Sequence, residues 1–244
     1  DFPENHPDEF RAQVYQNIDF RIGLSSAIDR EELIDVIFLG QGEPYQLAPS
    51  PRSPFYHERL ARQYTEFDPD LASEHLDRVL PNKDSEGFRL RPDGERFTVV
   101  IAVNKDFKSD WVDMMELIEG YWEAVGVDTV LDVVSDATST GRRGDPNNDI
   151  GLWIAENGAG RLPLVKPDEM MGIESDLEWN RWLESGGSEG QEPPADVKRM
   201  YELQMQIPLL AGDEQAAVMN EYLDMLADAM PRIGIALPAG NYRA

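Results

Sequence analysis

The chain has 244 residues, 41% of them hydrophobic, so it can bury a sizeable core. It carries 47 acidic against 22 basic residues, and this net charge of −25 argues against binding nucleic acid or an anionic membrane, whose phosphates it would repel. The absence of cysteine excludes disulfides, thiolate metal sites and cysteine nucleophiles. No apolar stretch approaches the roughly 20 residues of a membrane-spanning helix, so we expect no direct membrane insertion.

The first part of the chain contains two well-marked helix starts. Residues 29–32 form a D-x-x-E capping box, and apolar residues follow at helical spacing until Gly40. Residues 43–54 contain four prolines, which predicts an extended loop or an edge strand. The pair Asp68-Pro69 supplies a cap and a first helical position, so a second helix is expected to run to about Leu80.

The middle of the chain gives the strongest pattern. Residues 97–103 and 127–134 are predicted strands, and 149–154 are a shorter third one. Between the first two, apolar residues recur at helical spacing until Gly126, which predicts an amphipathic helix. A strand, a helix and a strand at this spacing indicate a parallel, right-handed βαβ unit. The residues expected to form core between helix and sheet are Trp111, Met115, Ile118 and Trp122.

The remaining segments are less regular. Two turns flank a short predicted strand at residues 88–90. Residues 163–194 carry many acidic side chains and are predicted to be surface loop with a short helix around Trp179 and Trp182. The last predicted elements are helices near residues 194–207 and 213–229 and a strand at 232–237.

The third predicted strand delivers a candidate ligand-binding segment. It ends in Trp153, and Glu156, Asn157 and Gly158 follow it. The ring offers flat contact area, the acid and the amide offer directed hydrogen bonds, and glycine lets the backbone approach a ligand. The alternative is that Trp153 belongs to the core and Glu156 is solvated.

Other chemistries have weaker support. The three histidines, His6, His57 and His75, lack the H-x-x-x-H spacing, and the turn at residues 84–87 lacks the further ligands of a calcium loop. There is no G-x-S-x-G motif and no P-loop. We therefore expect no metal and no cofactor. A carboxylate-dependent hydrolase remains the enzyme alternative, because glycosidases need only a pair of acids.

Several segments resemble the family 5 solute-binding proteins, which are the dipeptide, oligopeptide and nickel-type receptors of ABC importers. Residues 19–34 are similar to the family's "F-R-x-A-L-x-x-A-I-D-R-E-x-I-I" segment, and residues 121–128 to its "W-x-x-x-G-I-x-V". Residues 40–44, 67–77 and 88–94 lie between them in the family's order. The resemblance extends from about residue 7 to residue 237.

This resemblance implies an α/β fold, namely a periplasmic-binding-protein-like lobe with a mixed, mostly parallel sheet flanked by helices. Family members have two lobes that close on a ligand, so residues 1–244 are expected to be a single C-terminal lobe, with the N-terminal lobe and a final C-terminal segment absent. The resemblance further implies a monomeric, non-enzymatic receptor outside the cytoplasm, tied to the membrane by a lipid anchor in a Gram-positive cell, that passes a small solute to an ABC permease.

The resemblance also bears on the candidate site. In peptide-binding relatives, the acid of a "W-x-x-D" segment holds the terminal amine of the ligand, and Trp153 to Glu156 match that pattern with glutamate for aspartate. The Asp-Tyr pair common in peptide binders is replaced here by Glu156-Asn157, followed by Gly158. The resemblance therefore implies either a peptide or an oligosaccharide as ligand. An interaction domain without a small ligand is the remaining alternative.

Overall fold

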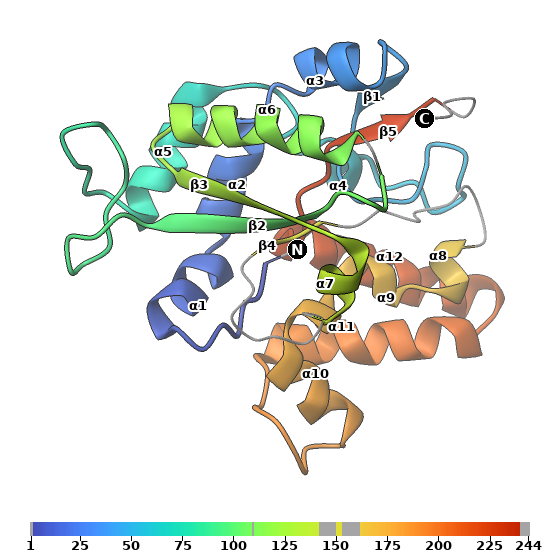
Figure 1. The fold of residues 1–244 in the computed structure, drawn as a ribbon. Coiled ribbons are helices and arrows are strands. Elements are labelled where there is room, and N and C mark those ends of the chain that lie inside the picture. The colour runs from blue at the N-terminus through green and yellow to red at the C-terminus, as the bar shows by residue number, and fades with distance from the viewer. Residues whose placement is uncertain (1, 109, 142–149, 153–161, 240–244) are drawn as a thin grey trace.

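The computed structural model describes residues 2–108, 110–141, 150–152 and 162–239 (Figure 1). Its strands form a three-stranded sheet across the middle of the molecule and a separate two-stranded sheet near the C-terminal end. Helix α6 (Trp111–Ala124) lies along the larger sheet, and helices α10 (Leu177–Glu184) and α11 (Ala195–Gln206) lie at the opposite end of the molecule from α3 (Arg30–Ile37). Among the described helices, none has the length and hydropathy needed to cross a membrane.

The larger sheet confirms the predicted parallel βαβ unit. Strand β2 (Thr98–Asn104) pairs in parallel with β3 (Asp128–Val134) along its whole length, and α6 connects the two. Strand β4 (Ile150–Gly151) pairs in parallel with the other edge of β2, so the order is β3-β2-β4. The described part of the third strand is thus shorter than the predicted 149–154, whose remaining residues except Leu152 lie outside the described ranges.

The N-terminal helices begin where their capping residues predict. Asp29 accepts a hydrogen bond from the Glu32 amide (2.9 Å) at the start of α3, and Asp68 accepts one from the Leu71 amide (2.9 Å). The proline-rich stretch starts as edge strand β1 in the small sheet, as predicted. The elements of this part are α1 (Glu9–Gln16), α2 (Ile18–Ser26), α3, β1 (Gly42–Pro44), α4 (Glu58–Arg62) and α5 (Pro69–Val79).

The prediction of a strand at residues 88–90 is wrong. Two isolated bridges, Lys83 with Arg89 and Leu90 with Arg96, take its place. The physical reason is the side chain of Arg89, which is fully buried and donates hydrogen bonds to the Leu80 and Val125 carbonyls (2.8 and 3.0 Å). The segment is held by this side chain and by single backbone bonds, such as that from the Arg89 amide to the Gly126 carbonyl (2.7 Å), and not by a continuous strand ladder.

The first core lies between α6 and the sheet. Val99, Ile101 and Val103 alternate along β2 and are fully buried, because successive strand residues point to opposite faces. The predicted helical face is confirmed: Trp111, Met115, Ile118 and Trp122 are all buried in this cluster.

A second core lies among the C-terminal helices, and it corrects the prediction of surface loop for residues 163–194. Four residues of that segment are buried in it: Met170, Met171, Ile173 and Trp179. The acidic side chains that suggested a loop alternate with these apolar ones. The short helix around Trp179 is confirmed as α10. The elements are α7 (Asp136–Gly141), α8 (Leu162–Val165), α9 (Asp168–Met171), the 3-10 helix η1 (Ile173–Ser175), α10, α11, η2 (Ile207–Leu209) and α12 (Gly212–Ala229).

The last predicted strand is shorter than expected. Strand β5 spans only Ala236–Pro238 and pairs antiparallel with β1. Upstream of it, the backbone of Gly234 bonds to side chains: its carbonyl accepts from Arg30 (2.8 Å) and its amide donates to the Gln46 side chain (2.7 Å). A Cβ on Gly234 would lie 2.4 Å from Gln46 Cα, so only glycine permits this approach. The backbone of Gly234 is therefore unavailable to a sheet.

Buried charged groups connect the N-terminal segment with the second core. Arg21 forms an ion pair with Glu4 (2.8 Å) and donates to the Ala229 carbonyl (2.9 Å) at the end of α12. The amide of Asn5 donates to the Asp176 carboxylate (3.1 Å). Burial, and then the charge of Glu4, raises the pKa of Asp176 well above its usual range, and burial raises the pKa of Glu4 although Arg21 opposes this.

Asp176→Asn is expected to stabilise the protein at neutral pH. Because the folded-state pKa is raised, this carboxyl opposes folding increasingly as the pH rises from about 4, its unfolded value, through the raised folded value. Asparagine keeps the oxygen that accepts from Asn5 but carries no charge. Denaturant titrations between pH 4 and pH 8 should show that the advantage of the variant grows with pH. An advantage that does not change with pH would contradict the assignment.

Candidate functional site

The polar cluster at the carboxyl edge of the larger sheet occupies the position where open α/β sheets bind ligands. β2 ends at Asn104 and β3 at Val134, and the loops that follow are joined by hydrogen bonds. The Asn104 side-chain amide donates to the Asp136 carboxylate (2.9 Å). The backbone amide of Asp136 donates to the Asp106 carboxylate (3.0 Å), and that of Asp106 donates to the Asn104 side-chain oxygen (3.1 Å). We call Asn104, Asp106 and Asp136 the edge cluster.

The edge cluster is suited to binding and orienting a solute. Asp106 and Asp136 are exposed, and Asn104 is half-buried, so their oxygens can accept hydrogen bonds from hydroxyl or ammonium groups. Our sequence analysis missed these three residues. A signal for them was available, because each follows closely on the end of a predicted strand.

The predicted ligand-binding residues lie outside the described ranges. Gly151 of β4 pairs with Ala102, two residues before the end of β2, and the parallel direction leads the chain toward the same carboxyl edge. Trp153, Glu156, Asn157 and Gly158 follow shortly after in the sequence. Their place beside the edge cluster therefore remains a prediction.

A small apolar hollow beside β4 is too small for a solute. Ile150, Gly151 and Leu152 line it together with Met115 and Trp122 of α6. Its volume is about 50 Å³, well below the roughly 300 Å³ at which pockets for small molecules begin. This hollow is a packing feature of the first core.

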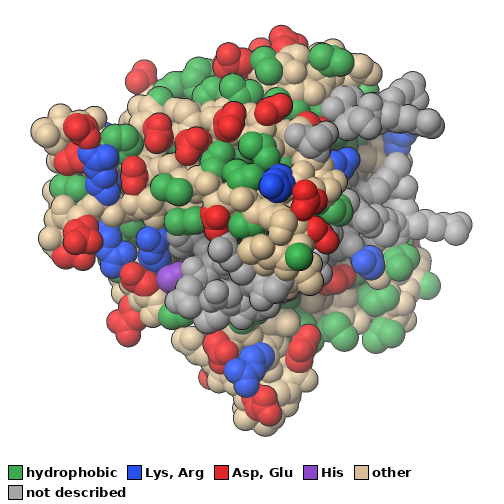
Figure 2. Space-filling view, viewed as in Figure 1, with side chains coloured by type: hydrophobic (Ala, Val, Ile, Leu, Met, Phe, Trp, Pro, Cys, Tyr) green, Lys and Arg blue, Asp and Glu red, His purple; other side chains and the backbone are tan. Residues whose placement is uncertain are grey.

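The charge around the larger sheet is negative. Acidic side chains are spread over the face of the molecule shown in Figure 2. On α6, burial, and then the neighbouring carboxylates of Glu123 and Glu116, raises the pKa of Glu119. The described residues hold no group of three histidine, cysteine, aspartate or glutamate side chains that could bind a metal ion. This charge favours neutral or cationic solutes over anionic ones.

The sequence matches a known family over most of its length. The profile of the middle region of the bacterial extracellular solute-binding proteins, family 5, matches residues 5–165. The chain therefore belongs to family 5 of the bacterial extracellular solute-binding proteins. A comparison with curated protein sequences finds no match.

Solved structures agree with this fold. The chain is similar to the oligopeptide-binding protein OppA, with a TM-score of 0.86 and 26% identity over 96% of this chain and 40% of that one. It is similar to MelB of Agrobacterium fabrum C58, solved with stachyose, with a TM-score of 0.76 and 18% identity over 96% and 36%. It is also similar to NikA of Brucella suis, solved with Fe(III)-EDTA, with a TM-score of 0.73 and 17% identity over 97% and 44%.

These matches confirm the periplasmic-binding-protein-like α/β lobe. The chain spans about two fifths of the length of the structures that it matches.

Proposed function

We propose that this chain is the ligand-binding lobe of an extracytoplasmic receptor that delivers oligopeptides or a similar small solute to an ABC permease. The observation that carries the proposal is the family 5 match over residues 5–165, together with the fold shared with OppA. In this proposal residues 1–244 are the C-terminal lobe of a monomeric two-lobed protein. Ligand stabilises the closed state of the two lobes, and no covalent chemistry is needed. In a Gram-positive cell, a lipid anchor outside this lobe would hold the receptor at the membrane.

An oligosaccharide is the second candidate ligand. Glu156-Asn157 replaces the Asp-Tyr pair of peptide binders, and an acid, an amide and a tryptophan also suit sugar hydroxyls and a sugar face. The structure of MelB contains stachyose, which supports sugar binding within this fold.

A carboxylate-dependent hydrolase would need paired acids in a cleft, with perturbed pKa values. Glu4 and Asp176 have raised pKa values. However, Glu4 is paired with Arg21, and Asp176 accepts a backbone amide, so both are also explained as buried structural groups. Family membership favours the receptor. Turnover of a chromogenic glycoside or ester that Asp176→Asn abolishes would favour the hydrolase instead.

A thermal-shift screen tests the receptor function. The complete two-lobed protein is screened against di- to pentapeptides and against oligosaccharides of similar size. A ligand at 100 times its dissociation constant should add about 2.7 kcal/mol to the free energy of unfolding. Stabilisation by peptides alone or by sugars alone decides between the two ligands, and no stabilisation by either class would contradict the proposal.

Glu156→Gln and Trp153→Ala test the predicted site. If the ligand is a peptide, Glu156→Gln should weaken binding by about 3 kcal/mol, because a buried ammonium group loses its charged partner. If the ligand is a sugar, the same change should cost less, since an amide still bonds a hydroxyl. Trp153→Ala should weaken both through lost stacking area.

Calorimetric titration of the folded variants of the complete two-lobed protein measures these effects. Glu123→Gln, on the exposed side of α6, is the matched control and should bind as the wild type does. Wild-type affinity in both site variants would show that the segment after β4 is not the site.

A further inference from the structure

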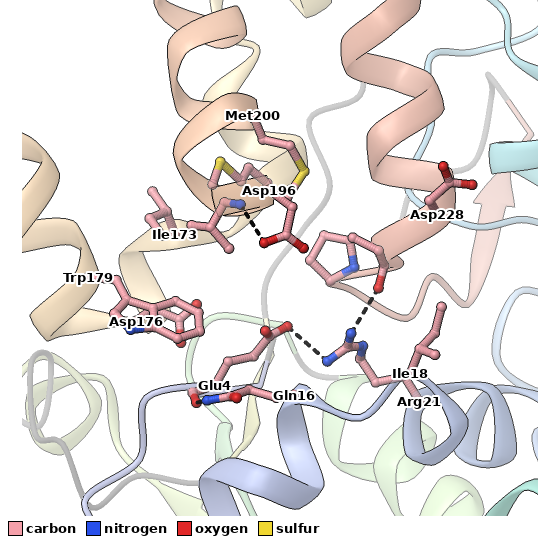
Figure 3. A pocket seen from close by; sticks show the side chains of 14 residues that line it. Glu4, Gln16, Ile18, Arg21, Ile173, Asp176, Trp179, Asp196, Met200 and Asp228 are labelled. Atoms are coloured by element: carbon pink, nitrogen blue, oxygen red, sulfur yellow. Dashed lines mark hydrogen bonds and ion pairs between the residues drawn. The ribbon is translucent and has the colours of Figure 1, made fainter. Parts of the chain in front are cut away.

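A separate cavity of about 250 Å³ lies between the N-terminal segment and the C-terminal helices (Figure 3). The described residues that line it all come from residues 4–21 and 171–231, and none of them belongs to the larger sheet or to the edge cluster. The volume lies near the lower end of the range of small-molecule pockets, so it is room for a small organic molecule.

The polar wall of this cavity carries an excess of negative charge. Figure 3 shows the carboxylates of Glu4 and Asp196 reaching into the same space from opposite walls. Asp176 also lines the cavity, and it is only 7% exposed. These acids face one lining arginine, Arg21, among the described residues.

Arg21 does not neutralise all of these acids. Its two terminal nitrogens are used by Glu4 and by the carbonyls of Tyr15 and Ala229. Asp176 forms no ion pair with any residue that the structure describes; its carboxylate accepts the backbone amide of Asn5. Because buried carboxylates are stable when paired with a cation, this wall favours a ligand with an ammonium group.

Two buried donors in the same walls lack an acceptor. Trp179 and Arg21 are each 3% exposed, and Trp179 Nε1 and Arg21 Nε have no hydrogen-bond partner within the described chain. Buried N–H groups are nearly always paired, so each of these atoms indicates an acceptor that the described residues do not supply. The cavity thus offers acids for a cation, and the two N–H donors lie just beneath its wall, where a small side-chain shift brings them to an oxygen of a ligand.

The remaining wall is apolar. Ile173, Met200 and the ring of Trp179 line it. Such a wall suits a short methylene chain between the two polar ends of a ligand.

We propose that this cavity binds a small amino compound, with an ammonium group held by Glu4, Asp176 and Asp196 and a carboxylate or carbonyl oxygen held by Trp179 and Arg21. This site is independent of the solute site proposed at the sheet edge.

γ-Aminobutyrate is the probe, because it carries both groups on a three-carbon chain. Butyrate lacks the ammonium group and butylammonium lacks the carboxylate, so these two are matched controls. The readout is the indole N–H resonance of Trp179 in the ¹⁵N-labelled protein, assigned with Trp179→Phe. Millimolar γ-aminobutyrate is expected to move this resonance downfield in a saturable way, while each control moves it at least tenfold less at equal concentration.

The variants locate the binding. Asp176→Asn and Glu4→Gln should each weaken γ-aminobutyrate binding at least tenfold, with folding checked by circular dichroism. Glu156 belongs to the proposed solute site, so Glu156→Gln should leave γ-aminobutyrate binding unchanged. This variant separates a failure of the cavity proposal from a failure of the receptor function. An unmoved Trp179 resonance at 50 mM probe, an equal response to butyrate, or wild-type affinity in both acid variants would overturn the proposal.

Discussion

Trp122→Ala should lower the free energy of unfolding by about 3–5 kcal/mol, the cost typical of removing a large aromatic side chain from a core. Trp122 is 4% exposed and lies in the first core, between α6 and the sheet. Its Nε1 donates to the Leu24 carbonyl (3.0 Å), so the variant also leaves a buried acceptor without its partner. Urea titration measures the loss.

Phe67→Ala is the matched control for Trp122→Ala. Phe67 is 50% exposed, so its truncation should cost less than about 1 kcal/mol. If Trp122→Ala costs as little, the first core is not packed as described.

Arg30→Leu should also lower the free energy of unfolding by about 3–5 kcal/mol, but for a different reason. Arg30 is 1% exposed and donates to the carbonyls of Ser25 (2.7 Å) and Gly234 (2.8 Å) and to the Ser25 hydroxyl (2.7 Å). Leucine fills part of the volume but leaves the buried Gly234 carbonyl without its donor, and a buried group left unpaired costs about 1–3 kcal/mol. The Ser25 carbonyl and hydroxyl lose the charged donor but keep bonds from the Ile28 amide (3.2 Å) and the Gln46 side chain (2.9 Å).

Arg199→Leu is the control for Arg30→Leu. Arg199 pairs with Glu221 (2.7 Å) at the surface, where an ion pair contributes about 1 kcal/mol or less. Urea titration should therefore show a much larger loss of unfolding free energy for Arg30→Leu than for Arg199→Leu. Equal losses would show that the Arg30 hydrogen bonds do not connect the C-terminal segment to α2 and α3.

Elements with a strong local pattern could be predicted from the sequence. β2, α6 and β3 follow from alternation and helical spacing, and α3 and α5 follow from their capping residues. Elements fixed by distant partners could not. Residues 232–235 have the sequence pattern of a strand, but Gln46 and Arg30 bond to the backbone of Gly234 from 188 and 204 residues away.

The same distinction holds for the candidate sites. Asn104 and Asp136 are 32 residues apart, and only the pairing of β2 with β3 brings them together. The link between Asn5 and Asp176 spans 171 residues, and no local pattern points to it. Trp153 and Glu156 had a local signal, namely an aromatic and an acid at the end of a strand, and their role stays a prediction.

Calorimetric titration of residues 1–244 beside the two-lobed protein tests the central claim most directly. The ligand is the tightest peptide or oligosaccharide from the thermal-shift screen. If this chain is one lobe of a receptor that closes on its solute, it should fold alone but bind much more weakly, because part of the contacts come from the other lobe and closure needs both. Equal affinity from residues 1–244 and from the two-lobed protein would contradict the account.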